Sequence, residues 1–295
     1  MAIVLINVFQ MIDFRKYSIN IGGRLVELAK PQVMGILNVT PDSFYSASRC
    51  GEDRDIIRQR VRQIVDEGAD MIDVGGYSSR SGADDVSAEE EYRRLRIGLE
   101  IIAEEAPDMI ISVDTFRASV AERCVEECGA HIINDISGGD MDKDMFLTVA
   151  RLHVPYILMH MRGTPATMTQ LTEYENVTAD VIKDLAFKAD RLRRLGVCDI
   201  IVDPGFGFSK NVEQNYEMMR HLHEFVEMGY PVLVGISRKS MIYKLLGTKP
   251  EAALNGTTVL NTFALMQGAH ILRVHDVKAA VEAVKIVSAT NGNEF

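Results

Sequence analysis

The stretch Ile200-Ile-Val-Asp203-Pro-Gly-Phe-Gly-Phe208 joins the pattern of a buried strand to a polar end. Three β-branched residues in succession are typical of a strand that is buried on both faces. Asp203 stands where the apolar run stops, and the Pro-Gly pair after it prevents continuation as strand or helix. Gly207 lets the backbone approach a ligand closely, and the two phenylalanines offer flat apolar surface. The stretch therefore predicts either a site for a flat, hydrogen-bonding ring or a strand-ending turn that Asp203 caps.

The same order of residues recurs along the chain. A glycine that can end a helix is followed by a short link, an apolar strand and a polar residue, in copies that begin at Gly68, Gly129, Gly196 and Gly268. Further apolar runs lie between these copies, each soon after a proline: Pro31, Pro107, Pro155 and Pro231. Together they predict eight strands, and apolar residues at helical spacing fill the stretches between them.

Eight strands that alternate with helices over residues 31–295 predict one (β/α)8 TIM barrel of the α/β class. The alternative is an open, doubly wound sheet, but no G-x-G-x-x-G opens a helix in this sequence. Residues 1–30 are expected to form an N-terminal segment that caps the barrel. Within it, residues 14–28 predict a β-hairpin that turns at Gly22-Gly23.

Two local patterns give finer predictions for the helices. Ser87 followed by Glu90 predicts a capping box at the start of a helix. Met218, Leu222 and Phe225 lie on one apolar stripe at helical spacing, which predicts one continuous helix there.

The composition is that of an ordinary globular protein with a sizeable core. The chain has 295 residues, of which 47% are hydrophobic and 25% charged, and its net charge of −10 argues against a nucleic-acid partner. Cys124 and Cys128 lie four apart without a second ligand pair at zinc spacing and are interpreted as small buried apolar residues. Only four cysteines in the chain fit a reducing compartment, so a cytoplasmic location is expected. The apolar residues 2–9 are too few to span a bilayer, and no membrane association is expected.

In a (β/α)8 barrel the carboxyl ends of the strands and the loops after them form the active face. One polar strand end is routine solvation, whereas polar residues at every strand end predict a functional site at one mouth. These residues are Asn38, Asp73, Asp114, Asn134, Asp135, His160, Asp203, Ser237, Arg238, Lys239, Arg273 and His275.

The polar residues divide by chemistry. Asp114, Asn134 and Asp203 can satisfy a ring with amide-like and amino groups side by side, as in guanine or a pterin. The basic residues suit a phosphate or pyrophosphate, and they are Arg80, Arg238, Lys239, Arg273 and His275. Taken singly, Arg80 and Arg238 could be surface charges and His275 a helix cap. Asn38 offers an oxygen ligand for Mg²⁺, which commonly adds substrate phosphates to one or two protein oxygens.

Two long polar loops lie beside the predicted mouth, over residues 40–53 and 75–85. They are candidates for lids that exclude water from a reactive intermediate.

These residues resemble those of the dihydropteroate synthases over about residues 31–287. The motifs that carry the resemblance, in chain order, are Met34-Gly-Ile-Leu-Asn-Val-Thr-Pro-Asp-Ser-Phe44, Asp73-Val-Gly-Gly-Tyr-Ser-Ser-Arg-Ser-Gly82, Ser112-Val-Asp-Thr115, Ile133-Asn-Asp-Ile136, Met159-His-Met-Arg-Gly163, Asp203-Pro-Gly-Phe-Gly-Phe208, Ser237-Arg-Lys-Ser240 and Arg273-Val-His-Asp-Val277. The resemblance implies a transferase of folate biosynthesis. It would condense 6-hydroxymethyl-7,8-dihydropterin diphosphate with p-aminobenzoate to give 7,8-dihydropteroate and pyrophosphate, with Mg²⁺ as cofactor.

The resemblance also implies roles for single residues. Pterin binding falls to Asp114, Asn134, Asp203 and Lys239. The diphosphate falls to Ser79, Arg80, Arg273 and His275, with Asn38 meeting Mg²⁺, and the expected catalytic residues are Lys239, Arg80, Arg273 and His275. The p-aminobenzoate pocket, for which sulfonamides would compete, is bordered by Ser79, Ser81, Phe208, Ser237 and Lys239.

The sequence departs from the usual family pattern in two loops. The second loop usually reads Glu-Ser-Thr-Arg-Pro-Gly, whereas here it is Tyr77-Ser-Ser-Arg-Ser-Gly82, and the first loop continues as Tyr45-Ser-Ala-Ser-Arg49 in place of Ser-Asp-Gly-Gly. Two other interpretations stay open at this point: a methyltransferase barrel that uses methyltetrahydrofolate, and an inactive pterin-binding paralogue. A homodimer is expected only because the family forms one.

Overall fold

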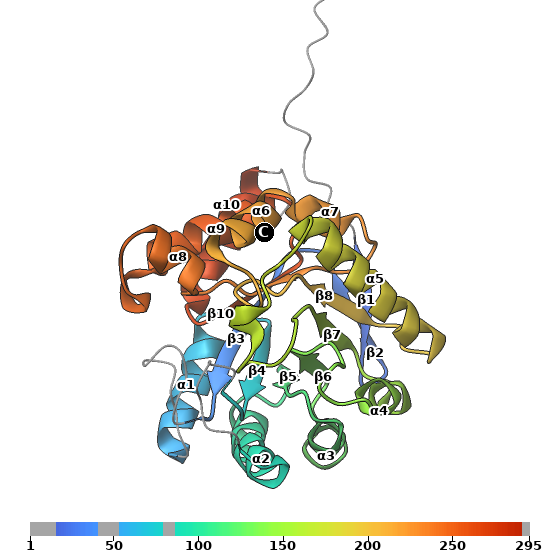
Figure 1. The fold of residues 1–295 in the computed structure, drawn as a ribbon. Helices are drawn as coiled ribbons and strands as arrows, with labels where there is room; N and C mark the ends of the chain where they lie inside the picture. Colours follow the sequence, from blue (N-terminus) through green and yellow to red (C-terminus); the bar gives the residue numbers. More distant parts are fainter. Residues whose placement is uncertain (1–15, 41–52, 79–85, 291–295) are drawn as a thin grey trace, which may run out of the picture.

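The computed structural model describes residues 16–40, 53–78 and 86–290, and a barrel of eight parallel strands forms its centre (Figure 1). The strands neighbour one another in the order β8-β7-β6-β5-β4-β3-β10-β9. A parallel bridge between Val202 and Val232 joins β8 to the start of β9, so the ring of strands is nearly closed. The expected TIM barrel is confirmed. Its strands are β3 (Gln32–Asn38), β4 (Met71–Gly75), β5 (Ile110–Asp114), β6 (Ile132–Asp135), β7 (Tyr156–Met159), β8 (Ile200–Asp203), β9 (Leu233–Val234) and β10 (Ile271–Val274).

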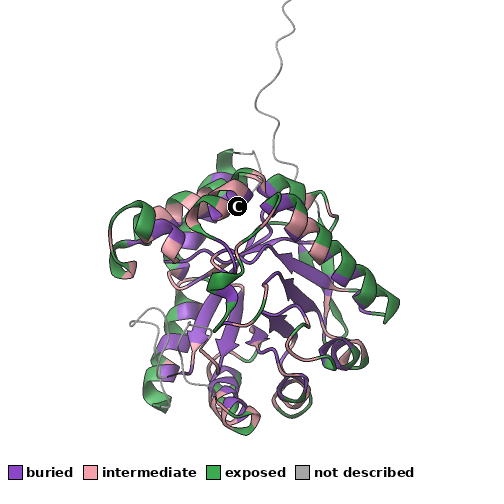
Figure 2. Ribbon diagram, in the orientation of Figure 1, coloured by how far each residue is buried: buried purple, intermediate pink, exposed green. Residues whose placement is uncertain are grey.

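Helices surround the strands and turn their apolar stripes inward, so buried residues gather on the strands and exposed ones on the outer helix faces (Figure 2). The repeat glycines 68, 129, 196 and 268 all have φ between +71° and +93°, the left-handed conformation that ends a helix without a Cβ clash. The helices are α1 (Arg54–Asp66), α2 (Ala88–Glu105), α3 (Ala118–Cys128), α4 (Met145–Leu152), α5 (Val177–Arg194), α6 (Val212–Arg220), α7 (Leu222–Val226), α8 (Ser240–Leu245), α9 (Leu254–Met266) and α10 (Val277–Thr290), with short 3₁₀ turns at Met168–Gln170 and Pro250–Ala252.

The continuous helix predicted from Met218 to Phe225 is wrong. The chain forms α6 and α7, which are separated at His221, a residue with a non-helical backbone (φ −106°, ψ 20°). The helical spacing of apolar residues continues across this break because Met218, Leu222 and Phe225 are all buried in the same core.

The capping box predicted at Ser87 forms only in part. Ser87 Oγ accepts a hydrogen bond from the Glu90 N–H at 3.2 Å. The Glu90 carboxylate instead accepts hydrogen bonds from Arg93 and Arg94, whose guanidinium groups lie one turn further along the same face. A complete capping box joins Asn211 and Gln214 at the start of α6.

A hairpin closes the end of the barrel where the strands begin. Strands β1 (Tyr17–Ile21) and β2 (Arg24–Leu28) pair antiparallel, with the predicted turn at Gly22-Gly23. One apolar cluster joins the hairpin to the strands, through Ile19, Ile21, Leu28, Met34, Met71, Ile110, Ile132, Ile157, Ile201, Leu233 and Ile271. Among the described residues, no helix has both the length and the apolar character needed to cross a membrane.

Candidate functional site

A buried ion-pair network lies at the carboxyl ends of β4, β5, β6 and β10. The Arg273 guanidinium donates to Asp73 Oδ2 at 2.6 Å and to Asp114 Oδ2 at 2.7 Å. The Asn134 amide donates to the same oxygen of Asp73 at 3.1 Å. The sequence repeat places these residues on four separate strands, and barrel closure brings them together.

Burial and neighbouring charges shift the titration of this network. Burial raises the pKa of Asp114 to about 7, with Asp73 adding to the rise and Arg273 opposing it. Burial opposes the charge of Arg273, but the two carboxylates outweigh it and raise the pKa of the guanidinium. The network therefore holds a permanent cation beside a carboxyl group that changes charge near neutral pH.

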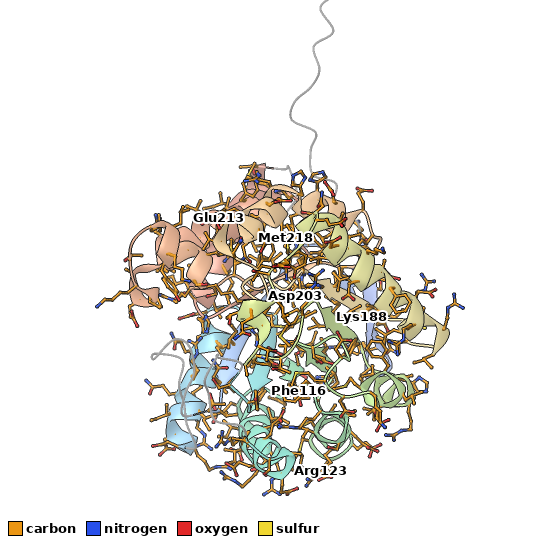
Figure 3. All side chains as sticks on the ribbon, in the orientation of Figure 1. Phe116, Arg123, Lys188, Asp203, Glu213 and Met218 are labelled. Atoms are coloured by element: carbon orange, nitrogen blue, oxygen red, sulfur yellow. The ribbon has the colours of Figure 1, made fainter. Side chains whose placement is uncertain are left out.

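The ends of β8 and β9 form the adjoining part of the mouth. A Cβ built on Gly235 would lie 3.9 Å from Asp203 Oδ2, 3.9 Å from Arg273 Cβ and 4.0 Å from Lys239 Nζ. These three side chains therefore lie close together around Gly235, which has no side chain of its own. Asp203 lies near the centre of the barrel (Figure 3).

Asp203 and Lys239 influence each other's protonation. Burial raises the pKa of Asp203, and the Lys239 cation limits that rise. Burial lowers the pKa of Lys239 to about 8 against the attraction of Asp203. The Lys239 ammonium also lies 4.6 Å from the centroid of the Phe208 ring, a cation–π distance.

Ser237 and His275 form a third part of the mouth. Ser237 Oγ lies 3.0 Å from His275 Nδ1 and accepts from the His275 backbone N–H at 3.1 Å. Burial lowers the pKa of His275 to about 3, and the cations of Arg273 and Arg60 add to this effect. The imidazole is therefore neutral at pH 7 and lies beside two cations.

A small apolar cluster borders these polar groups. It contains Phe116, Ile136, Met159, Met161, Met168 and Phe208, with Tyr77 and Met141 packed against it. The Tyr77 ring meets Phe116 edge-on at 5.0 Å. Such a wall suits a flat aromatic ring beside the polar set.

Three of the predicted strand-end residues point away from the mouth. Asp135 accepts from Tyr156 Oη at 2.7 Å and from Ser137, since it follows Asn134 on a strand and so faces the opposite side. His160 contacts the buried ammonium of Lys210 at 3.0 Å.

The third residue is Arg238, and its prediction as a phosphate ligand is wrong. Its guanidinium forms a two-point ion pair with Asp276 at 2.8 and 2.9 Å and donates to the carbonyls of Pro250 and Glu251. A left-handed backbone at Arg238 (φ +54°) lies between Ser237 and Lys239, and both of these flanking side chains remain at the mouth.

Asn38 lies at the mouth as predicted. It ends β3, and its Oδ1 would lie 3.3 Å from a Cβ on Gly75, so it shares the mouth with Asp114. Ser79, Arg80 and Ser81, and most of the two loops proposed as lids, lie outside the described residues.

The sequence reasoning missed several buried charged residues, and two of them, Glu91 and Lys210, contact elements of the mouth. Glu91 has no exposed surface, pairs with Arg117 and accepts from Thr115 Oγ1 at 2.5 Å behind the mouth. Lys210 is 8% exposed and contacts the Asp203–Phe208 stretch. A signal for Lys210 was available, because a lysine directly after a buried glycine-aromatic loop must find partners.

A metal ion would have few protein ligands here. Within the ranges that the structure describes, no three His, Cys, Asp or Glu side chains could together hold a metal ion. Asn38 supplies one hard oxygen at the mouth, which fits a Mg²⁺ ion that takes most of its ligands from a substrate diphosphate and water.

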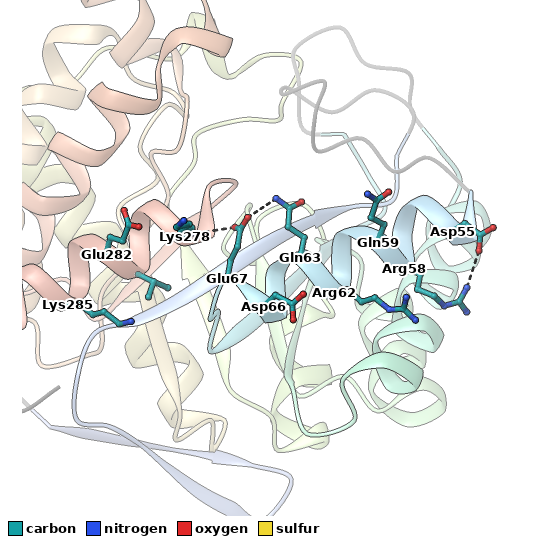
Figure 4. A pocket seen from close by; sticks show the side chains of 11 residues that line it. Asp55, Arg58, Gln59, Arg62, Gln63, Asp66, Glu67, Lys278, Glu282 and Lys285 are labelled. Atoms are coloured by element: carbon teal, nitrogen blue, oxygen red, sulfur yellow. Dashed lines mark hydrogen bonds and ion pairs between the residues drawn. The ribbon is translucent and has the colours of Figure 1, made fainter.

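A groove of about 760 Å³ lies elsewhere, on the outer wall between α1 and α10 (Figure 4). Arg58 and Arg62 of α1 and Lys278 and Lys285 of α10 line it, but Arg58 and Arg62 already pair with carboxylates of α2. No mouth residue lines this groove, and we do not assign it to the site.

Comparison with known proteins agrees with this geometry. The model of a family described as "Pterin binding enzyme" matches residues 34–275. Dihydropteroate synthase from Escherichia coli (strain K12) is 42% identical over 270 residues, which are 91% of this chain and 94% of that protein. The chain belongs to the dihydropteroate synthase family.

Solved structures of dihydropteroate synthases share the whole fold. The Yersinia pestis dihydropteroate synthase, in a complex with a sulfonamide drug, superposes with a TM-score of 0.88 at 39% identity and covers 94% of this chain and 100% of its own. The Thermus thermophilus dihydropteroate synthase, in complex with 4-aminobenzoate, gives a TM-score of 0.82 at 37% identity and covers 92% and 99%.

Proposed function

We propose that the mouth residues of this dihydropteroate synthase barrel carry out the family's reaction, the condensation of 6-hydroxymethyl-7,8-dihydropterin diphosphate with p-aminobenzoate. The reaction makes this chain a transferase of folate biosynthesis. The observation that carries the assignment of roles is the meeting of Asp203, Lys239 and Arg273 around Gly235. Hydrogen-bond acceptors for a pterin thus lie directly beside cations for a leaving diphosphate.

Asp114, Asn134 and Asp203 are proposed to hold the pterin. A pterin displays an amide-like edge and an amino group, and these need acceptors and a donor in one plane. Asp203 is 5% exposed and Asn134 3% exposed, so a ring that reached them would be out of water and its hydrogen bonds would be strong. Lys239 lies beside Asp203 and would bond the same ring.

Arg273 and His275 are proposed to receive the diphosphate. Burial is the main cause of the lowered pKa of His275, and the nearby cations of Arg273 and Arg60 add to it, so positive charge that an arriving anion could neutralise lies beside the ring. The C–O bond to the diphosphate would break with both electrons on the leaving oxygen, and the cations would stabilise the developing charge. Arg80 and Ser79 stay predictions for the same role.

Asn38 is proposed to hold Mg²⁺ together with the diphosphate oxygens. The ion would supply charge neutralisation on the leaving group. Loss of activity on chelation, restored by added Mg²⁺, is the expected result.

p-Aminobenzoate is proposed to lie against Phe208 and near Ser237 and Lys239, with Ser79 and Ser81 as further predicted neighbours. Its amine lone pair would form the new C–N bond to the pterin methylene carbon, and the amine would then lose one proton. An arylamine needs no strong base for this attack. Sulfonamides imitate p-aminobenzoate and are proposed to compete for the same pocket.

A pyrophosphate-release assay with both substrates, and with each omitted in turn, tests the function. We expect rapid release only with both substrates present. Rapid release without p-aminobenzoate would indicate a hydrolase instead. Absence of release with both would favour an inactive paralogue. Methyl transfer from methyltetrahydrofolate is the third reaction to assay. The basic residues at the mouth argue against it, because that reaction has no diphosphate leaving group to bind.

A homodimer and a cytoplasmic location stay predictions. An apolar surface on α8, α9 and α10 supports the dimer, since Leu245, Leu246, Val259, Phe263, Met266 and Ile286 are each 42 to 64% exposed. Sedimentation of the wild type and of Phe263→Glu would test it, because a buried carboxylate should dissociate a dimer formed there.

A further inference from the structure

The reaction proposed above assigns no role to a buried lysine two residues beyond Phe208. Lys210 Nζ lies 2.9 Å from the Phe208 carbonyl oxygen, 3.0 Å from the Gly205 carbonyl oxygen and 3.0 Å from His160 Nδ1. Burial and the Lys210 charge lower the pKa of His160 to about 2, so the ring is neutral and its Nδ1 can accept. Burial lowers the pKa of Lys210 itself to about 7 against the attraction of Asp203, so the ammonium form is held below that pH. This form has three hydrogens, and each finds a partner here.

Both carbonyls belong to the stretch 203–208, whose other peptide groups are also held. Lys239 Nζ donates to the Phe206 carbonyl at 2.5 Å, and the Gly207 N–H donates to Asn215 Oδ1 at 2.7 Å. The Gly205 N–H donates to Asp203 Oδ1 at 2.8 Å. Two lysines and an asparagine therefore fix the backbone between the Asp203 carboxylate and the Phe208 ring.

The backbone turns sharply to bring Lys210 back to the stretch it follows. Ser209 has φ +52°, an unfavourable conformation that persists only where the surroundings hold it. Ser209 Oγ accepts from the Arg162 N–H at 2.7 Å and donates to the Arg162 carbonyl at 3.0 Å, and Tyr174 Oη donates to the Ser209 carbonyl at 3.0 Å. These bonds hold the turn after β8 against the loop after β7.

The stretch packs directly against the loop after β7. A Cβ on Gly205 would lie 2.0 Å from the His160 carbonyl oxygen, so the two loops are in direct backbone contact. Gly205 also has φ +73°, which a side chain would strain. Because Lys210 holds this stretch by two of its carbonyls, loss of those bonds is expected to shift Asp203 and Phe208 against the loop after β7.

We propose that Lys210 is a positioning residue: through the Gly205 and Phe208 carbonyls it fixes the Asp203 carboxylate and the Phe208 ring, without touching substrate. The inference rests on the proposed pterin role of Asp203. Loss of the ammonium leaves two buried carbonyls and the His160 nitrogen without their donor, and the stretch relaxes to regain partners. A displacement of about 1 Å at such a site costs roughly 100-fold in rate.

The test compares wild type, Lys210→Gln and Lys210→Met. Methionine is neutral and similar in length, whereas glutamine keeps an amide donor for one carbonyl. We expect the affinity for pteroic acid, the oxidised form of the product, to fall in the order wild type, Gln, Met, by roughly 10- to 100-fold for Met, the scale of losing one hydrogen bond to the Asp203 carboxylate. The KM for the pterin diphosphate should rise by a similar factor.

Lys188→Met is the matched control. Lys188 is 4% exposed and pairs with Asp140 at 2.7 Å and Asp184 at 3.0 Å, and it lies on α5 at the side of the barrel (Figure 3). Both Met variants should lower the melting temperature, but only Lys210→Met should weaken pteroic acid binding. Where Lys210→Met does not fold, Lys210→Gln alone decides.

Three results would overturn the role of Lys210. One is a folded Lys210 variant whose pteroic acid affinity stays within about threefold of wild type. The second is an equal loss of affinity in Lys188→Met, which would make the effect one of general destabilisation. The third is a wild type that binds no pteroic acid, which would reject the pterin role of the mouth as well, whereas the first two leave it standing.

Discussion

The two ends of the barrel are formed by the same eight strands, but apolar side chains fill one end and charged side chains meet at the other. At the hairpin end, Ile19 and Leu28 pack against the strand starts and exclude water. At the other end, Asp73 and Asp203 are buried and Arg273 is half-buried beside Asp73. The apolar end stabilises the fold, whereas the charged end carries the groups that we propose to bind substrate.

The strongest test of this contrast removes the cation of the polar end. Arg273→Met leaves Asp73, whose side chain has no exposed surface, without its cation. We expect a loss of roughly 3–5 kcal/mol in the free energy of unfolding, together with loss of activity. Urea unfolding measures the first effect and pyrophosphate release the second.

The double variant Asp73→Asn/Arg273→Met provides the control. It removes the unpaired charge, so stability should partly return while activity stays lost. If the single variant unfolds at the wild-type urea concentration, the ion pair contributes nothing to the fold.

At the hairpin end, Leu28→Ala should destabilise without touching catalysis. Leu28 is 1% exposed, and its truncation leaves a cavity that costs about 3 kcal/mol. Leu25→Ala on the same hairpin is the control, since Leu25 is 73% exposed and should change stability by less than about 0.5 kcal/mol. A rise in KM for either substrate in Leu28→Ala would show that the two ends are coupled.

Asp203→Asn should reduce pterin binding by about 1.5–3 kcal/mol, the value of a hydrogen bond to a charged group. Calorimetry with pteroic acid measures it. Asp135→Asn is the comparison, because Asp135 is equally buried on the next-but-one strand but bonds Tyr156 on the outer side. Unchanged affinity in a folded Asp203→Asn variant would remove the assignment.

The smallest expected effect is a pH dependence of kcat/KM for the pterin substrate. Asp114, with a pKa raised to about 7, is ionised above that pH, so binding that needs its carboxylate falls as the pH drops below 7. Lys239, with a pKa lowered to about 8, loses its proton as the pH rises through 8. The profile should peak between these values and fall by about tenfold per unit beyond them.

Asp114→Asn sharpens this prediction, since it should remove the acid limb and leave the alkaline limb in place. A wild-type profile that is flat from pH 6 to 9 would show that neither group controls binding. The diphosphate of the substrate also titrates. Repeating the pH series with the binding of pteroic acid, which has no diphosphate, separates that titration from those of Asp114 and Lys239.

Much of the fold could be read from local pattern. Glycines with φ of +71° to +93° end the helices at the predicted repeat, and the apolar runs after the prolines become strands. Local rules suffice here because helix ends and strand burial depend on neighbours in the chain. The break at His221 between α6 and α7 could not be read, since a helical stripe looks the same on one helix or two.

The candidate site was only partly predictable. Asp114, Asn134, Asp203, Lys239 and Arg273 do meet at one mouth, because parallel strands in a barrel end on the same side. The sequence could not separate Arg238 from Lys239, two adjacent cations, because the left-handed backbone that directs one to Asp276 and the other to Phe206 is a tertiary feature.

The sequence by itself determined the barrel, the family and the end of the barrel at which the polar residues meet, since these follow from periodicity, ordered motifs and strand polarity. Only the tertiary structure decided which buried charges lie at the mouth and which pair elsewhere in the barrel. Asp73 becomes the partner of Arg273, and Lys210 the support of the Asp203 loop, through contacts between residues far apart in the chain or across a strained turn. Such partners depend on distance and burial, and neither quantity is written in the order of the residues.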